Sequence, residues 1–127
     1  MTKQDVQDAL SALGVDHLYR YKLETRALPQ ILHMDERIYG VTSGVYESRR
    51  WMAVATRNHL YLISVSPISK TEVKLVERAK IQQVQASRGL IFAKITITHS
   101  EGTILLEHVA KASVPSFLRS FDAVTHP

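Results

Sequence analysis

The chain has 127 residues, 45% of them hydrophobic, which suffices for one globular domain with its own core. It contains no cysteine, so disulfides, thiolate catalysis and cysteine-based zinc sites are excluded. The formal net charge is only +4, and acidic residues interrupt the basic ones, which argues against a dedicated nucleic-acid binder.

The hydropathy of the sequence predicts a soluble protein without a transmembrane segment. The N-terminal stretch MTKQDVQDALSALGVDH is too polar for a signal peptide. No run of about 18 apolar residues is present that could span a bilayer. Together with the absence of cysteine, these features favour a reducing cytoplasm as the location.

A helix is predicted at the start of the chain. Thr2 and Asp5 have the spacing of a capping box, and apolar residues then recur at helical spacing. Gly14 can adopt the left-handed conformation that ends a helix, which gives bounds of about Lys3–Leu13. A second helical segment is expected from Asp16.

Proline shapes the end of this helical part. Pro29 disfavours helical angles at Leu28, so a helix is not expected to continue through that point. Proline suits the first turn of a helix, which predicts a new, brief helix over Pro29–His33. The apolar residues of the helical part either cover the side of the following domain or pack against another subunit, and the sequence does not separate the two.

From Glu36 onward the sequence is typical of an antiparallel all-β unit, because β-branched and aromatic residues dominate and turn signals recur about every ten residues. Three turns are expected, at Thr42–Gly44, Ser87–Gly89 and Ser100–Gly102. The predicted strands are Arg37–Thr42, Arg50–Thr56, His59–Ser66, Glu72–Val76, Ile81–Ala86, Leu90–His99 and Thr103–Val109.

An amphipathic helix is predicted at the end of the chain. Ser113 is a suitable N-cap, and Pro115 falls in the first turn, where proline is tolerated. A helix of about eleven residues is too short to be stable alone, so its apolar stripe must pack on the open end of a curved sheet. The stripe consists of Val114, Phe117, Leu118, Phe121 and Val124.

Three segments carry a resemblance to a known family. They are LPQILHMDERIYG (Leu28–Gly40), MAVATRNHLYLI (Met52–Ile63) and SVPSFLRSF (Ser113–Phe121). These segments resemble the YokE-like bacterial pleckstrin-homology (PH) domains, which show a short helix, an acid-plus-isoleucine entry to the first strand and a threonine–turn–basic–apolar–aromatic hairpin. Glu36 and Ile38 match the entry.

The hairpin matches in part. Thr56, Leu60 and Tyr61 stand where the family pattern requires them. The family's turn often carries asparagine directly after the threonine and arginine before the next strand, whereas this chain has Arg57 and His59 at those places.

The resemblance implies an α+β, mainly β fold: a PH-like barrel of about seven antiparallel strands closed by a C-terminal helix. Residues 1–34 would form a helical extension packed on the barrel, and residues 35–127 the PH-like domain, as a single structural unit. It also implies a non-enzymatic binding or assembly module, whose partner is another protein or further copies of the chain. Some related bacterial domains form ring-like homo-oligomers, and a prophage origin is considered.

No catalytic, cofactor-binding or metal-binding residues are predicted. Nucleophile-elbow, Walker and His-Glu-x-x-His motifs are absent, and the histidines lack the spacing of helical metal ligands. His99 and His108 could face each other across a hairpin, but without a carboxylate they are weak evidence. A small enzyme is the least favoured alternative, because it would need a deep pocket with a perturbed acid or base.

Four residues are predicted to contact a partner or an anion: Tyr46, Arg49, Arg50 and Arg57. Tyr46 is expected in a loop, where it could face a partner. Guanidinium groups suit phosphate oxygens, so weak binding of anionic lipid headgroups is the alternative function. Arg49 and Arg50 are adjacent and point to opposite faces of a strand, and Arg57 is roughly 20 Å further along, so one shared phosphate pocket is not expected.

Other charged and aromatic residues are assigned to the surface and the core. The basic residues between positions 70 and 80 alternate with Glu72 and Glu77, which is typical of an exposed, charge-compensated strand and loop. Without an aromatic stacking platform nearby, this segment does not suit nucleic acid. Trp51 and Tyr61 are expected in the core.

Overall fold

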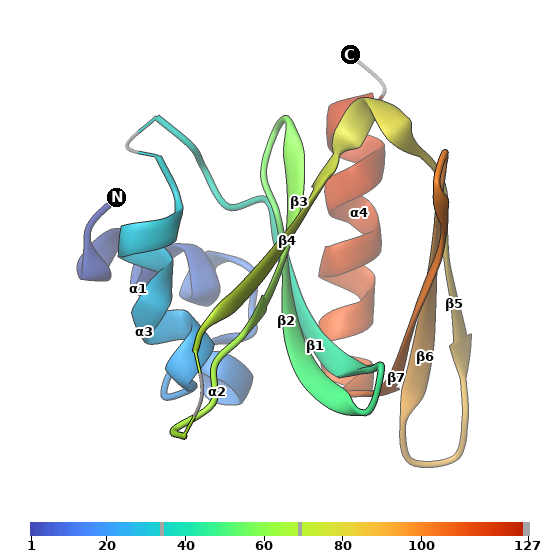
Figure 1. Ribbon diagram of the computed structural model, residues 1–127, viewed down its shortest axis with the longest axis horizontal. Helices are drawn as coiled ribbons and strands as arrows, with labels where there is room; N and C mark the ends of the chain where they lie inside the picture. The colour runs from blue at the N-terminus through green and yellow to red at the C-terminus, as the bar shows by residue number, and fades with distance from the viewer. Residues whose placement is uncertain (34, 69, 126–127) are drawn as a thin grey trace.

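The computed structural model describes residues 1–33, 35–68 and 70–125, with side chains described up to residue 122. Three short helices come first, seven strands follow, and a longer helix ends the chain (Figure 1). The strands form one antiparallel sheet in the order β4-β3-β2-β1-β7-β6-β5. This is the predicted architecture: a mainly β fold closed by a C-terminal helix.

The first helix, α1 (Lys3–Ala12), begins as predicted. The Thr2 side chain accepts from the Asp5 amide, and the Asp5 carboxylate accepts from the Thr2 amide, which completes the capping box. Gly14 follows with a φ of +73°, the left-handed conformation expected after the helix. The short α2 (Asp16–Tyr19) comes next.

The predicted break at Pro29 is wrong. A single helix, α3 (Leu23–Ile31), runs through the proline. The local cost at Leu28 is outweighed by packing, because Leu28 is fully buried under the sheet. The Thr25 hydroxyl, which lies one turn before the proline, donates to the Tyr19 carbonyl over 2.5 Å and ties the start of α3 to the end of α2.

The strands are close to their predicted positions except at both ends of the first strand and at the start of the sixth. Their bounds are β1 (Gly40–Tyr46), β2 (Arg49–Ala55), β3 (His59–Ser64), β4 (Glu72–Glu77), β5 (Ile81–Arg88), β6 (Ala93–His99) and β7 (Gly102–Val109). A 3-10 turn, Arg78–Lys80, joins β4 to β5, and a second, Lys111–Ser113, precedes α4 (Val114–Thr125).

The predicted turn at Thr42–Gly44 is wrong, since these residues lie inside β1. Gly44 has a packing role instead. A Cβ atom there would lie 2.9 Å from the Glu107 carbonyl oxygen and 2.9 Å from the Leu106 Cβ, so the glycine permits β7 to approach β1 closely. The hairpin turns instead at Glu47 and Ser48, which lie between the paired residues Tyr46 and Arg49.

The sixth strand begins later than predicted, at Ala93 rather than Leu90. Strand β5 correspondingly extends to Arg88, and the turn comprises residues 89–92. The backbone N–H of Gly89 donates to the Phe92 carbonyl over 2.8 Å, which closes the turn. The predicted turn at Ser100–Gly102 is confirmed in place, with Gly102 pairing with His99.

Two apolar cores lie on the two faces of the sheet. The inner face packs against α4, and the outer face packs against α1, α2 and α3 (Figure 1). Alternate residues of one strand serve the two cores: Trp51 of β2 belongs to the inner core and Met52 to the outer core. The N-terminal helices therefore cover the side of the sheet.

Helix α4 follows the predicted apolar stripe. Val114, Phe117 and Phe121 are buried on the inner face and Leu118 is partly buried, while the Val124 side chain lies outside the described residues. The Arg78 guanidinium donates to the carbonyls of Ser120 and Phe121, each over 3.2 Å, and lies 4.3 Å from the Phe121 ring.

The antiparallel order places alternate connections at opposite ends of the sheet. The β1–β2, β3–β4 and β5–β6 connections lie at one end, called here the lower end because it is lowest in Figure 1. The β2–β3, β4–β5 and β6–β7 connections lie at the opposite, upper end. This alternation decides which side chains can act together.

Candidate functional site

The β1–β2 hairpin brings Tyr46 and Arg49 opposite each other at the lower end of the sheet. The prediction that Tyr46 lies in a loop is wrong, because Tyr46 is the last residue of β1. Glu47 and Ser48 form the turn, with φ of 51° and 65°. Positive φ at both central positions is the geometry of a tight hairpin, which matches the twist of the strands at the cost of left-handed conformations in two non-glycine residues.

Aromatic rings and cations gather on the inner face beside this turn. We call Tyr46, Arg49, Trp51 and Lys74 the aromatic–cation cluster. The Lys74 Nζ lies 5.1 Å from the Tyr46 ring centroid and 5.3 Å from that of Trp51. The Arg49 Cζ lies 5.4 Å from the Trp51 ring. These distances are within the range at which a cation is attracted to an aromatic face.

Register explains why these residues meet. Arg49 and Trp51 are two apart on β2 and so share a face, and Lys74 reaches them from β4. The Trp51 Nε1–H donates to the Tyr46 carbonyl over 3.0 Å, which fixes the indole across the hairpin. Trp51 is almost fully buried, as predicted, so its ring is a platform for the cations rather than an exposed surface.

Each cation of the cluster is matched by an exposed carboxylate. Glu72 accepts from Arg49 over 2.5 Å, and Glu47 accepts from Lys74 over 2.7 Å. The Glu47 hydrogen bond raises the pKa of Lys74, and the same bond holds the pKa of Glu47 below its usual range. An incoming anion must compete with these carboxylates, so the cluster does not resemble a vacant phosphate pocket.

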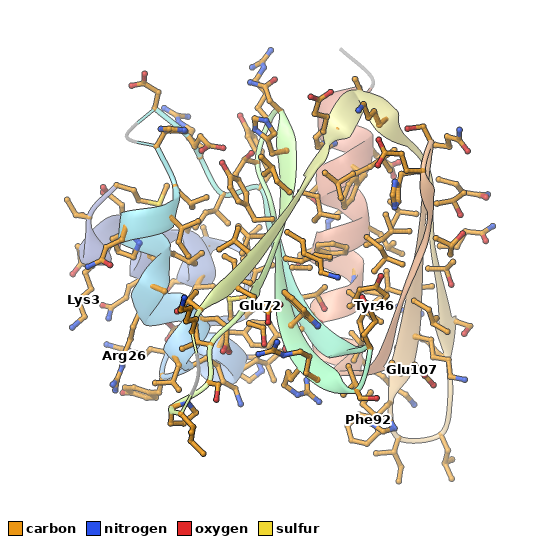
Figure 2. The ribbon with its side chains drawn as sticks, viewed as in Figure 1. Lys3, Arg26, Tyr46, Glu72, Phe92 and Glu107 are labelled. Atoms are coloured by element: carbon orange, nitrogen blue, oxygen red, sulfur yellow. The ribbon has the colours of Figure 1, made fainter. Side chains whose placement is uncertain are left out.

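Arg50 points to the other face of the sheet, as the alternation predicts. Its guanidinium donates to the Ser43 hydroxyl over 3.3 Å and to the His108 carbonyl over 3.4 Å. Figure 2 shows the lower end, with Tyr46, Glu107 and Phe92 labelled close to it. Arg49 and Arg50 thus point to opposite faces of β2, although both line one cavity of about 550 Å³ at the lower end.

Arg57 lies in the β2–β3 connection at the upper end and joins neither arginine. A cavity of about 340 Å³ is found there, lined in part by Arg57, Glu36 and Thr56. The structure therefore brings together Tyr46 and Arg49, places Arg50 behind them and leaves Arg57 remote. The expectation that these cations would not share one phosphate pocket agrees with this placement.

Beside Arg57, a buried tyrosine and a histidine flank one carboxylate. The Tyr61 hydroxyl donates to the Glu36 Oε1 over 2.6 Å, and the His59 Nδ1 lies 3.8 Å from the Glu36 Oε2. Burial acts to raise the pKa of Glu36, but hydrogen bonds from Tyr61, the His33 amide and Thr56 outweigh it, so this pKa lies below its ordinary value. Burial and the Glu36 bond together raise the pKa of Tyr61.

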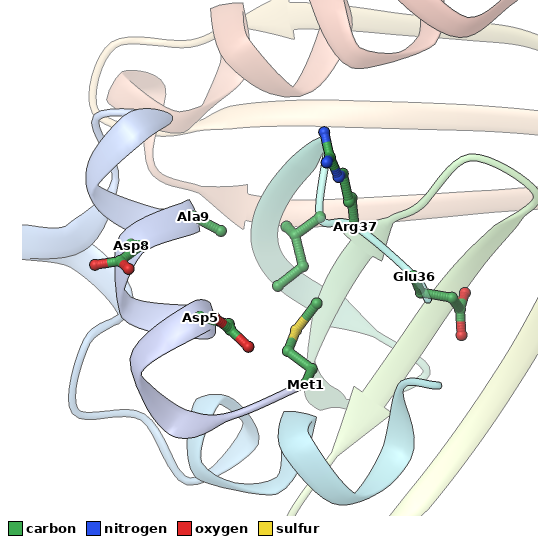
Figure 3. Close-up of a pocket in the computed structure, with 7 residues that line it drawn as sticks. Met1, Asp5, Asp8, Ala9, Glu36 and Arg37 are labelled. Atoms are coloured by element: carbon green, nitrogen blue, oxygen red, sulfur yellow. The ribbon is translucent and has the colours of Figure 1, made fainter. Parts of the chain in front are cut away.

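A second cavity of about 340 Å³ lies between α1 and the segment that leads into β1. Figure 3 shows Asp5 and Asp8 on the helix side and Arg37 on the facing segment. The Asp5 carboxylate is engaged in the capping box, and its hydrogen bonds with Thr2 hold its pKa below the usual range. This carboxylate therefore serves the helix end.

Metal ligands do not cluster within residues 1–33, 35–68 and 70–125: no group of three or more histidine, aspartate or glutamate side chains is placed to hold an ion. His99 and His108 do not face each other as considered. His99 pairs with Gly102 at the upper end, whereas His108 packs on Phe92 at the lower end, with ring centroids 5.3 Å apart.

Within residues 1–33, 35–68 and 70–125, no helix is long and apolar enough to cross a membrane.

The sequence missed Lys74 and Glu47 as members of the cluster. Lys74 was assigned to a charge-compensated surface strand, which is correct locally, but its position over Trp51 depends on the β3–β4 register. A pattern could have indicated this: Val76 is the one residue of β4 packed on the inner core, and Lys74 lies two residues before it on the same face.

Comparison with known proteins agrees with this architecture. A search of the curated proteins gave no match. A family model described as "Bacterial PH domain" matches residues 32–122, more than two thirds of the chain. The match includes all seven strands and most of α4, and it begins after α3. The chain therefore belongs to the bacterial PH domain family.

Proposed function

We propose that this chain is a non-enzymatic binding module that assembles with further copies of itself through the free edge of β4. PH domains are in general binding modules without catalytic activity, which supports the coarser part of the proposal. The observation that carries the finer part is that β4 pairs only with β3 and exposes two apolar residues, Val73 at 45% and Leu75 at 55%.

The exposed pair continues an apolar surface that the molecule already uses. Val73 is in register with Ile63, and Leu75 with Tyr61, on the outer face that α1, α2 and α3 cover. The helices pack on β1, β2 and β3 but leave β4 uncovered, so the apolar surface of the outer face continues onto the exposed Val73 and Leu75. An edge strand also presents unpaired backbone N–H and C=O groups, which are a template for pairing with another strand.

Edge pairing between two copies would satisfy both features at once. A second β4 adds backbone hydrogen bonds, and its own Val73 and Leu75 cover those of the first chain. Because the same surface acts on both subunits, the contact closes as a symmetric dimer. The aromatic–cation cluster, with Tyr46 and Arg49, lies on the other face of the same strands and is left accessible to a partner protein.

Light scattering over a range of protein concentrations tests this proposal. We expect the mean mass of the native chain to rise with concentration, and the double variant Val73→Ser, Leu75→Ser to remain monomeric. Leu105→Ser is the matched control, because Leu105 is 39% exposed but lies on β7, between two paired neighbours. A native chain that stays monomeric at every concentration contradicts self-assembly.

Three finer expectations remain proposals: the YokE-like branch of the family, a cytoplasmic location and a prophage origin. The segments Leu28–Gly40, Met52–Ile63 and Ser113–Phe121 support placement in the YokE-like branch of the family. The absence of cysteine from the sequence supports a location in the reducing cytoplasm. Fractionation of cells that express the tagged chain tests the location, and the neighbouring genes test a prophage origin.

A further inference from the structure

A groove of about 520 Å³ runs between the edge of β5 and helix α4. Strand β5 is the last strand of the sheet, at the edge opposite to β4, and within the described residues it pairs only with β6 (Figure 1). Four consecutive residues of β5, Ile81–Val84, line the groove. Because side chains alternate between the two faces of a strand, four lining residues in a row place the groove along the strand edge.

The edge of β5 is suited to pairing with a further strand. Its backbone N–H and C=O groups that point away from β6 have no strand partner within the described residues. Charged side chains and proline are common guards of such an edge, but residues 81–86 contain neither. The one irregularity is a bulge at Gln82, and the pairing with β6 is regular from Gln83 to Arg88.

The groove has an apolar wall. Leu118 and Phe121 contribute to it from α4, and Val84 contributes from β5. Leu118 and Val84 are packed on the inner core but remain partly exposed. An apolar side chain that enters the groove would therefore remove further apolar surface from water, which favours binding.

A buried cation in the groove lining selects the charge of the ligand. Arg78 is only 6% exposed and is one of the residues that line the groove. Its Nη2 donates to the carbonyls of Ser120 and Phe121, but its Nε and Nη1 are buried and have no acceptor within the described residues. Arg78 also makes no ion pair in this part of the chain.

These two deficits have the same remedy. A buried donor without an acceptor and a desolvated cation without an anion both raise the free energy of the unbound chain. A carboxylate that enters the groove relieves both. Because Nε and Nη1 are covered in the unbound chain, the guanidinium has to turn toward the groove to meet it, and such side-chain changes are common at interfaces.

Asp122 is the one acidic residue among the described residues that line the groove. Its side chain is exposed, so water screens its charge. The charge of Arg78 is screened much less, because that side chain is buried. The groove therefore favours an anionic ligand, and Asp122 reduces this preference without reversing it.

The edge, the apolar wall and the buried cation together select the ligand. We propose that the groove binds an extended acidic segment of a partner protein, which adds a strand to β5 and directs one carboxylate toward Arg78. Backbone pairing provides affinity for any extended segment, and the contacts with Leu118 and Arg78 provide specificity. Residues on one face of a strand are spaced by two, so the segment is expected to carry an apolar and an acidic residue at even spacing.

This surface is separate from the one proposed for self-assembly. Strands β4 and β5 are the opposite edges of the sheet, so assembly through β4 leaves the groove beside β5 open. The two proposals also differ in the occupant, which is a second copy at β4 and a different protein at β5.

Selection of peptides on the immobilised native chain tests the proposal. The probe is a displayed library of random peptides of about twelve residues, long enough to pair along β5. We expect the selected peptides to share an acidic and an apolar residue at even spacing. In nuclear magnetic resonance spectra of the isotope-labelled chain, a selected peptide should shift the amides of β5 and of residues 117–122 most, and it should slow the exchange of β5 amides with solvent.

Charge variants on exposed residues test the preference for an acid. Gln82→Glu adds a carboxylate to the groove lining and should raise the Kd of a selected peptide about fivefold. Gln85→Glu is the matched control, because Gln85 is on the same strand and equally classed as exposed but does not line the groove; its Kd should stay within about twofold of the native value. Asp122→Asn should act in the opposite direction and lower the Kd about twofold.

The peptide is varied in place of Arg78, because Arg78 also holds the end of α4. Replacement of the acidic residue of the peptide by its amide should raise the Kd about tenfold, since the buried guanidinium then lacks its anion. With the amide peptide, the penalty of Gln82→Glu should disappear.

Four results would each overturn the proposal: no enrichment of peptides, selected peptides without a common acidic residue, amide shifts that lie away from β5 and α4, and equal effects of Gln82→Glu and Gln85→Glu. The double variant Val73→Ser, Leu75→Ser should bind the peptide like the native chain, and a loss of binding would move the peptide site to β4. Light scattering of that variant is measured without peptide, so failure here leaves assembly through β4 to its own test.

Discussion

Single residues show how far this chain departs from local preference when packing demands it. Arg78 is only 6% exposed and meets no carboxylate within the described residues, yet its guanidinium donates to two carbonyls at the end of α4 and packs on Phe121. A cation at a helix C-terminus is favourable because the last carbonyls carry partial negative charge. Burial lowers the pKa of Arg78, but no approach to neutrality follows for a guanidinium.

Glu36 provides a pH prediction at the residue scale. Its pKa is lowered in the folded chain, so this carboxylate stabilises the fold above the ordinary glutamate pKa, and that contribution is lost as the pH falls through the folded pKa. Tyr61→Phe removes the strongest of the hydrogen bonds that lower this pKa. We expect acidification below pH ~4 to lower the free energy of unfolding of this variant by less than that of the native chain.

Urea unfolding at neutral and acidic pH measures this difference. Asp5 and Glu47 also have lowered pKa values, so both proteins will lose stability in acid, and only the difference between them reports on Glu36. Tyr21→Phe is the control, since the Tyr21 side chain is 78% exposed and takes part in none of the hydrogen bonds that lower the pKa values of Glu36, Asp5 and Glu47. Parallel pH profiles for the native chain and Tyr61→Phe would contradict the assignment.

At the scale of single elements, the strands and their alternation could be predicted but their ends could not. In β6, apolar Ala93, Ile95 and Ile97 alternate with polar residues, and this pattern indicates the buried face correctly. The end of β1 was misplaced because Gly44 was interpreted as a turn signal, whereas it permits a close approach of β7. A glycine in a strand and a glycine in a turn look alike until the neighbouring strand is known.

The candidate site was predictable only in part, for the same reason. Arg49 and Tyr46 were predicted as contact residues, but their pairing across the hairpin was not, because the turn was placed at Thr42–Gly44. Lys74 is added by pairing with a strand far along the chain, and such contacts leave no spacing signal in the sequence. The helix through Pro29 shows a similar limit, because burial of Leu28 overrode a local rule.

The β1–β2 turn provides a prediction at this scale. Ser48 has a φ of 65°, a conformation that costs a non-glycine residue about 1–2 kcal/mol. Ser48→Gly should therefore stabilise the chain by about 0.5–1 kcal/mol, after the larger backbone entropy of glycine in the unfolded chain is subtracted. The urea midpoint should rise accordingly.

Ser87→Gly is the matched control for this turn variant. Ser87 is exposed and lies in the extended backbone of β5, so glycine there should destabilise by about 0.5–1 kcal/mol. Equal shifts of both variants in the same direction would show that the left-handed backbone of the turn does not determine the effect.

At the scale of the whole molecule, the family match covers residues 32–122, whereas the packed core also includes the N-terminal helices. The match begins at residue 32, but α1 and α3 bury residues against the outer face of the sheet, including Leu10 and Leu28 at 0% exposure. A sheet that lost these helices would expose Met52, Val54 and Ile63 to water. We therefore propose that residues 1–34 and 35–127 unfold as one unit.

Leu10→Ala tests this unity. Removal of a fully buried leucine should cost about 2–5 kcal/mol. If the chain is one cooperative unit, the loss appears equally in the fluorescence of Trp51, which lies in the other core, and in far-ultraviolet circular dichroism. A Trp51 midpoint that does not move would show that the helical extension unfolds separately. Tyr21→Ala, at a residue that is 78% exposed, should leave both midpoints unchanged.

The sheet has helices on both of its faces, and this arrangement has a consequence for how the chain can change. The helices cover most of both faces of β1, β2 and β3, while β5, β6 and β7 face water on their outer side. Recognition can therefore use this outer side and the rim, which comprises the turns and the two edge strands. Rim residues contribute little to either core, so their sequence can be replaced without refolding the molecule. The chain is accordingly suited to grafting of a new β5–β6 turn or a new β4 edge. Such a graft would change the binding partner but leave the two cores, which contain Trp51 and Leu10, unchanged.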